Sequence, residues 1–178
     1  MTTVSEDDCE PIRVAANDEE TWRWFGYRAD GKHFETFWPR FLGEHKPPAE
    51  VRWIVRYEGE VVGATSFLDV QPNHKRLEIG GTWYRHDMRA TVVNPAAKFR
   101  LLERAFRCGF DRVELKTDAR NTRSRAAIAK LGGREEGTLR RHMINHDGRA
   151  RDTVYFSILA AEWPEVRSRL EARISSLG

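Results

Sequence analysis

Two short segments of the sequence combine arginine with small polar residues where a helix is expected to begin. The first covers residues 85–95, and the second covers residues 117–125, with three arginines beside Asn121 and Ser124. The first turn of a helix has free backbone N–H groups and the positive end of the helix dipole, so it attracts anions. Arginine adds charge-assisted hydrogen bonds to phosphate oxygens. Together the segments predict a site for a phosphorylated ligand.

The pattern of apolar residues places each of these segments directly after a strand. We expect strands at 75–84 and 112–118, and helices at 94–108, with Asn94 as N-cap, and at 121–131. A strand, a helix and a second strand in this order indicate a parallel pair with a right-handed crossover, whose carboxyl ends open into one crevice. Alternatively, the arginines are ordinary surface residues, some of them paired with Asp118.

The remaining periodicity predicts a single α/β (α+β) domain over residues 1–178, with a core at about 20–165. Helices are expected at 11–16, 19–25, 34–43 and 161–175, and antiparallel strands at 51–57, 61–70, 136–144 and 152–159. Residues 1–10 lack alternation and are predicted to be disordered. Because these residues show no strand pattern, we expect that a first strand is missing and that another segment or a homodimer contact protects the edge of the sheet.

Composition excludes several classes of protein. Of the 178 residues 40% are hydrophobic, and no apolar run approaches the roughly 20 residues needed to span a bilayer. With no secretion signal and only Cys9 and Cys108 as cysteines, a cytoplasmic location is expected. The 30 basic and 27 acidic residues are interspersed, which disfavours direct binding of nucleic acid. The six histidines show no zinc-type spacing, so no metal site is expected.

Several motifs, taken in order, resemble the GNAT N-acetyltransferases, and more closely their branch related to RimJ and RimL. The similar stretches are LEIGGTW (77–83), RATVVNPAAK (89–98), RVELKTDARNTRSRAAI (112–128) and LGGREEG (131–137). This resemblance implies a mixed, mostly antiparallel sheet with a splayed central parallel strand pair and helices on both faces. It also implies acetyl-CoA as donor and direct transfer of the acetyl group to a primary amine.

The resemblance assigns residues 89–95 to the loop around the pyrophosphate, and Asn121 and Ser124 to positions near the pantetheine and thioester. Ser124 is the candidate proton donor to the departing thiolate, although an early-turn serine also serves simply to satisfy backbone groups. The candidate donor-binding residues are Trp83, Arg85, Arg89, Ala90, Thr91, Val92, Val93, Asn94, Asn121, Arg123 and Ser124.

The sequence departs from the family pattern at three places. Ala90 and Val92 stand where the phosphate loop usually has glycine, which predicts a differently shaped loop or weaker binding. Ile128 replaces a tyrosine that often acts as the acid, so Ser124 is the first candidate acid, with Tyr84 and Tyr155 as alternatives. The usual glutamate of the strand after Gly137 is also missing. Glu78 is therefore the first candidate base and His142 the second, with a water-mediated base or no dedicated base as further alternatives. An ion pair with Lys116 or with an arginine of the adjacent strand is the alternative role of Glu78.

The acceptor is less clearly indicated than the donor. The resemblance to RimJ and RimL favours a protein N-terminal amine, with a small-molecule amine such as an aminoglycoside or polyamine close behind. A non-catalytic sensor that binds CoA with the same fold is the alternative class. We expect the N-terminal helices, the turn at 84–88 and the hairpin at 142–149 to form the acceptor side.

Overall fold

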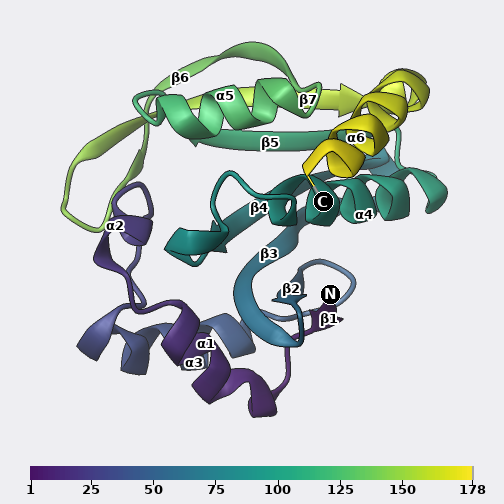
Figure 1. The fold of residues 1–178 in the computed structure, drawn as a ribbon. Helices are drawn as coiled ribbons and strands as arrows, with labels where there is room; N and C mark the ends of the chain where they lie inside the picture. Colours follow the sequence, from purple (N-terminus) through teal and green to yellow (C-terminus); the bar gives the residue numbers. More distant parts are fainter. Residues whose placement is uncertain (178) are drawn as a thin grey trace.

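The computed structural model describes residues 1–177, which form a seven-stranded sheet with helices on both faces (Figure 1). The strand order is β1-β2-β3-β4-β5-β7-β6, and every neighbouring pair is antiparallel except β4 and β5. The strands are β1 (Thr2–Thr3), β2 (Val51–Tyr57), β3 (Glu60–Gln71), β4 (Arg76–Tyr84), β5 (Arg112–Asp118), β6 (Arg134–Ile144) and β7 (Ala150–Leu159). The helices are α1 (Cys9–Ala15), α2 (Glu19–Trp22), α3 (Phe34–Gly43), α4 (Val93–Arg107), α5 (Thr122–Lys130) and α6 (Trp163–Leu177).

Alternation along the strands determines which helices cover each face. Successive strand residues point to opposite faces, so Val61 packs with the aromatic residues of α2 and α3 while Val62 packs with Val93 and Ala97 of α4. A larger apolar cluster joins strands β4, β5 and β7 to α4, α5 and α6. This arrangement confirms the predicted α/β fold with helices on both faces.

The parallel strands β4 and β5 separate after a short paired stretch. Only Arg76, Leu77 and Glu78 of β4 pair with residues 112–114 of β5, although both strands continue beyond this point. Strand β4 also carries a bulge at Gly81, where φ is +58° and the register with β3 shifts. The diverging carboxyl ends confirm the predicted splay and leave room between the strands for a ligand.

The N-terminal residues correct two predictions. Thr2 and Thr3 pair with Ile54 and Trp53 of β2, and the N–H of Val4 donates to the carbonyl of Arg52 over 3.1 Å. Residues 1–10 are therefore ordered, and the first strand is present in this chain. A strand of two residues is too short to leave an alternating pattern, so no local signal in the sequence marks it.

The start of α4 also differs from the prediction. The helix begins at Val93, so Asn94 is its second residue and not its N-cap. The hydroxyl of Thr91 accepts a hydrogen bond from the Val93 N–H over 3.3 Å and donates to the Met88 carbonyl over 2.8 Å. Pro95 is tolerated in the first turn because the N–H that proline lacks has no helical partner there. Thr91 thus shapes the loop before the helix.

Candidate active site

A large cavity of about 670 Å³ lies between the diverging ends of β4 and β5 and the starts of α4 and α5. It brings together residues that lie far apart in the sequence. The predicted site residues that line it are Glu78, Trp83, Arg89, Ala90, Asn94, Asn121, Arg123 and Ser124. The crevice expected from the strand and helix order is therefore present, and both arginine-containing segments contribute to it.

The other predicted residues do not line this cavity. Arg85 is held by Asp87 and Glu60, with contacts of 2.7 Å and 3.1 Å. His142 is exposed on β6, where its ring makes an edge contact with Tyr155. Val92 and Thr91 belong to the loop before α4, and Val93 is buried against the sheet. The structure thus leaves Glu78 as the predicted base that faces the cavity.

The loop before α4 keeps a left-handed residue although it has no glycine. Ala90 has φ +61°, a conformation that costs an L-residue about 1–2 kcal/mol, whereas Val92 has an ordinary helical φ of −63°. The differently shaped loop or weaker binding stays a prediction, while the backbone at Ala90 adopts the left-handed conformation that glycine favours. Arg89 reinforces the loop because its guanidinium donates to Thr21 and, over 3.0 Å, to Asp18.

Replacing Ala90 by glycine is expected to raise the free energy of unfolding by about 0.5 kcal/mol, because relief of the left-handed strain exceeds the added unfolded-state entropy. The matched control is Ala96→Gly in α4, which should lower it by about 1 kcal/mol because glycine is a poor helix former. Urea unfolding measures both. Equal destabilisation by the two substitutions would contradict the assigned conformation of Ala90.

The arginines at the start of α5 have different environments. Arg120 pairs with Asp118 over 3.4 Å, and Arg125 pairs with Glu135 over 3.1 Å. Arg123 lines the cavity and has no carboxylate within 4.0 Å among residues 1–177. Burial lowers the pKa of Arg89, and the nearby charge of Arg123 lowers it further. Two cations from different helix starts therefore converge on the cavity, an arrangement that favours a bound anion.

Ser124 and Asn121 lie together in the first turn of α5. The side-chain oxygen of Asn121 accepts a hydrogen bond from the backbone N–H of Ser124 over 3.0 Å, so Asn121 is the N-cap. Ser124 is half-buried and lines the cavity. Asn121 thus caps the helix. The hydroxyl of Ser124 is not used to cap the backbone of this turn.

Glu78 makes the ion pair considered for it and also lines the cavity. Its carboxylate is buried, lines the cavity and pairs with the Lys116 ammonium over 2.7 Å. Burial raises the pKa of Glu78, and the charge of Lys116 opposes that rise. A Cβ atom at Gly80 would lie 2.4 Å from the carboxylate, so glycine at this position makes room for it. Glu78 can accept a proton at the base of the cavity.

Lys98 is a residue of this cavity that the sequence analysis missed. Its side chain is buried, and its ammonium donates to Thr82 over 2.6 Å and to Thr65 over 3.3 Å. Burial lowers the pKa of Lys98 to about 7, and the charge of Glu78 opposes the change. One signal was available, because Lys98 falls on the apolar stripe of its helix between Asn94 and Leu102.

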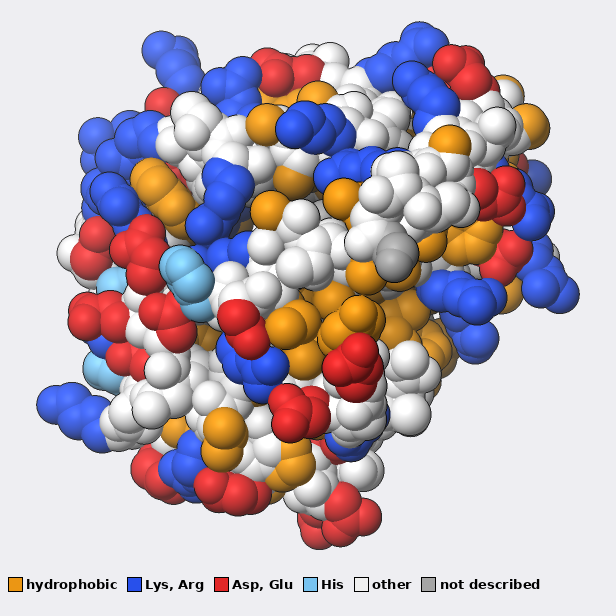
Figure 2. Space-filling view, viewed as in Figure 1, with side chains coloured by type: hydrophobic (Ala, Val, Ile, Leu, Met, Phe, Trp, Pro, Cys, Tyr) orange, Lys and Arg blue, Asp and Glu red, His pale blue; other side chains and the backbone are white. Residues whose placement is uncertain are grey.

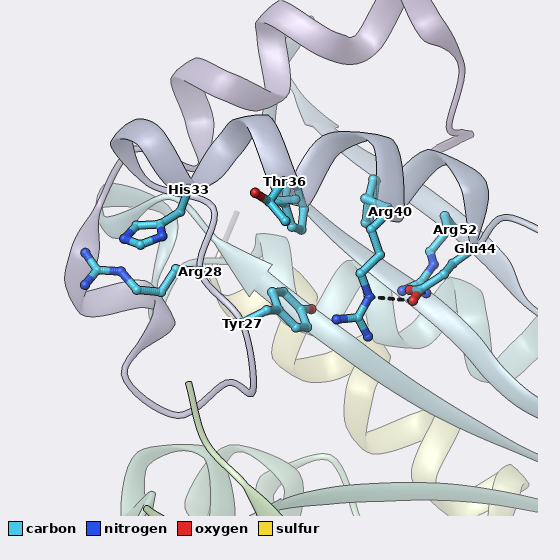
Figure 3. Close-up of a pocket in the computed structure, with 9 residues that line it drawn as sticks. Tyr27, Arg28, His33, Thr36, Arg40, Glu44 and Arg52 are labelled. Carbon is cyan, nitrogen blue, oxygen red and sulfur yellow. Dashed lines mark hydrogen bonds and ion pairs between the residues drawn. The ribbon is translucent and has the colours of Figure 1, made fainter. Parts of the chain in front are cut away.

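A smaller pocket of about 220 Å³ opens beside the cavity, with which it shares Tyr27, Arg40, Glu44 and Arg52 (Figure 3). Aromatic rings from α3 and the preceding loop line it, and Arg40 pairs with Glu44 over 2.6 Å. Burial raises the pKa of Tyr27 to about 12, so its hydroxyl stays neutral and can donate. The N-terminal helices thus build the side of the site opposite α4 and α5.

Charges of both signs cover the visible surface. In Figure 2, basic side chains are frequent over the region where α5, β6 and β7 lie in Figure 1, and acidic side chains lie among them. Within residues 1–177 no helix is long and apolar enough to cross a membrane. The same range contains no group of three or more histidine, cysteine, aspartate or glutamate side chains placed to hold a metal ion.

The fold and the site define an acetyltransferase of the GNAT class. Residues 1–134 match the family model of the acetyltransferase (GNAT) domain, so the chain belongs to the GNAT acetyltransferase family. The protein is accordingly an N-acetyltransferase that uses acetyl-CoA as its acetyl donor. Its cavity fits such a donor, with Arg123 and the left-handed turn at Ala90 at the helix starts.

Solved structures agree with this assignment. A Thermus thermophilus protein described as an acetyltransferase is 32% identical, with a TM-score of 0.86 over 96% of this chain and 90% of that one. RimJ of Mycobacterium smegmatis, solved with CoA-disulfide, is 22% identical and shares the fold, with a TM-score of 0.82 over 96% and 87%. Spermidine N-acetyltransferase of Vibrio cholerae, solved with CoA and spermine, is 15% identical, with a TM-score of 0.76 over 92% and 96%. A comparison with curated protein sequences gave no match.

Proposed function

We propose that this protein acetylates the primary amine at the N-terminus of a protein or peptide. The observation that carries the proposal is the joining of Glu78, Ser124 and the two arginine-bearing helix starts in one cavity that is open toward the N-terminal helices. The resemblance of the motifs to the RimJ and RimL branch favours this acceptor, and RimJ of Mycobacterium smegmatis has the same fold at 22% identity.

The donor is proposed to lie across the starts of α4 and α5. Arg89 and Arg123 hold its phosphates together with the free N–H groups of the first helical turns. The residues from Ala90 to Asn94 form the phosphate loop, and Asn121 fixes the first turn of α5 beside it. The thioester supplies the activated acetyl group, and Glu78 and Ser124 carry out the proton transfers.

Two side chains carry the proposed proton transfers. An amine with a pKa near 10 is mostly protonated at neutral pH, so it must lose a proton before it attacks the thioester carbonyl. Glu78 accepts that proton, and its pKa, raised by burial, favours this role. As the new N–C bond forms and the C–S bond breaks, Ser124 donates its hydroxyl proton to the leaving thiolate and regains a proton from the attacking nitrogen, which loses its second proton as it becomes the amide.

Two experiments test this proposal, one on the binding of acetyl-CoA and one on the identity of the acceptor. Titration calorimetry should show saturable binding of acetyl-CoA that weakens by about tenfold in Arg123→Met, because a charge-assisted contact to phosphate is lost. Thiol release should then require a peptide with a free N-terminus and stop when that N-terminus is already acetylated. No binding at millimolar acetyl-CoA would overturn the donor site, and thiol release with polyamines alone would overturn the peptide acceptor.

A further inference from the structure

A further buried cationic group lines the cavity, and the proposed transfer reaction leaves it unused. Arg151 of β7 has an exposed fraction of only 9%. Its one hydrogen bond within the described chain is a 3.4 Å contact from Nη1 to the carbonyl of Trp24, and its Nε has no partner there. A buried charge without a counter-ion is costly to fold, so its retention at a ligand cavity requires an explanation.

Asp118, the carboxylate whose charge acts most strongly on Arg151, makes its hydrogen bonds to other groups. Asp118 is fully buried, and its oxygens accept hydrogen bonds from the Arg120 backbone, the Arg120 guanidinium and the Asn145 amide. No carboxylate comes within 4.0 Å of Arg151 among residues 1–177. Asp118 therefore acts on Arg151 only as a more distant charge, and the guanidinium still has donors to offer.

Arg151 lies at the acceptor side of the cavity. Its contact with Trp24 ties β7 to the segment after α2, and the His146 N–H joins the β6–β7 hairpin to the Phe25 carbonyl over 3.0 Å. The charges that act on Arg151 include Glu78, whereas those that act on Arg89 are Arg123, Asp18 and Glu20. Arg151 and Glu78 thus line the same cavity, and Arg151 comes from β7, whereas the proposed phosphate contacts come from the segments at the starts of α4 and α5.

The charges that line the cavity also favour a negatively charged ligand beside Arg151. Seven basic and three acidic side chains line it, and all three acidic ones are already paired: Glu44 and Glu50 with Arg52, and Glu78 with Lys116. Four of the seven basic side chains have carboxylate partners, and Arg123 is assigned to the donor phosphates, so a polycationic acceptor would meet the unpaired cations Lys98 and Arg151. An acceptor with a negative group would complete the pairing.

We infer that the acceptor carries a carboxylate close to its reactive amine, and that Arg151 binds this carboxylate while Glu78 faces the amine. The inference rests on the proposed acetyl transfer and adds the chemical class of the acceptor. The carboxylate comes either from an acidic first residue of a peptide or from the α-carboxylate of a free amino acid. Both sources present the same planar acceptor pair to the guanidinium fork.

The experiment compares acceptors that differ in this carboxylate, with kcat/KM expressed per unprotonated amine because the carboxylate also raises the pKa of the amine. The probes are C-terminally amidated tripeptides that begin with aspartate or asparagine, the pair glycine and glycinamide, and spermidine, each assayed by thiol release from acetyl-CoA. In the wild-type protein kcat/KM should be at least tenfold higher for the acidic member of one pair than for its neutral partner, and spermidine should be the poorest acceptor. The pair that shows the preference identifies the source of the carboxylate.

Two variants test whether Arg151 causes the preference for the acidic acceptor. Arg151→Met should abolish the preference mainly by raising KM for the acidic acceptor, while turnover of the neutral acceptor changes less. Arg140→Met, which removes an exposed arginine of the neighbouring strand β6, should keep the preference. Thermal unfolding and acetyl-CoA binding show whether Arg151→Met remains folded. If it does not, the comparison of acceptors with the wild-type protein still tests the inference.

The outcomes separate this inference from the proposed function. Equal kcat/KM within both pairs, faster turnover of spermidine, or an unchanged preference in folded Arg151→Met would overturn the carboxylate inference and leave acetyl transfer intact. Absence of thiol release with every acceptor, despite acetyl-CoA binding, would overturn both proposals.

Discussion

Ser124→Ala is expected to lower kcat for acetyl transfer by about 100-fold while the Kd for acetyl-CoA changes less than threefold. The thiolate leaves more easily when a positioned hydroxyl protonates it, and such proton transfers contribute roughly 100-fold or more. The phosphates are proposed to bind at Arg89 and Arg123, so loss of the hydroxyl leaves donor affinity in place. Thiol release at saturating acetyl-CoA and titration calorimetry measure the two quantities.

Thr122→Ala is the matched control for this experiment. Thr122 carries a hydroxyl in the same turn of α5 but is exposed and does not line the cavity. It should change kcat by less than twofold. If Ser124→Ala also retains full kcat, the serine is only an early-turn helix residue and another group protonates the thiolate.

Lys98→Met is expected to stabilise the folded protein by about 3 kcal/mol at pH 6, because a buried ammonium is replaced by an apolar side chain of similar length. The pKa of Lys98 is about 7 in the folded protein, compared with an ordinary value of 10.5. Its two hydrogen-bond partners are not left unpaired, because the hydroxyls of Thr65 and Thr82 also lie 2.7 Å from each other. Thermal and urea unfolding measure the gain.

The pH dependence of this gain has a definite sign. Between pH 7 and pH 10.5 the unfolded chain binds a proton at Lys98 that the folded protein does not, so wild-type stability rises with pH in this range. The destabilising contribution is fully present below pH 7 and is lost as the pH rises to 10.5. The advantage of Lys98→Met should therefore shrink between pH 7 and pH 10. The exposed control Lys130→Met should show no such trend, and a constant advantage would contradict a depressed pKa.

The sequence by itself determined the order of strands and helices and the edge at which the site lies. These features depend on local signals: strand and helix periodicities, turn residues, and the handedness of a strand-helix-strand unit. For that reason the order of residues alone places the segments containing Arg89 and Asn121 in one crevice. Ser124 was assigned through the resemblance to the GNAT family, and Glu78 was chosen as a candidate base from its position on the expected strand once the family's usual glutamate was found missing.

Only the tertiary structure decided how the individual side chains are used, because those uses depend on contacts between distant segments. Arg89 is held by Asp18, 71 residues away, and Arg151 contacts Trp24, 127 residues away. The left-handed turn at Ala90 has no local signal, since alanine by itself avoids that conformation. The burial of Lys98 and Arg151 likewise follows from packing around the cavity, and burial gives these cations their unusual chemistry.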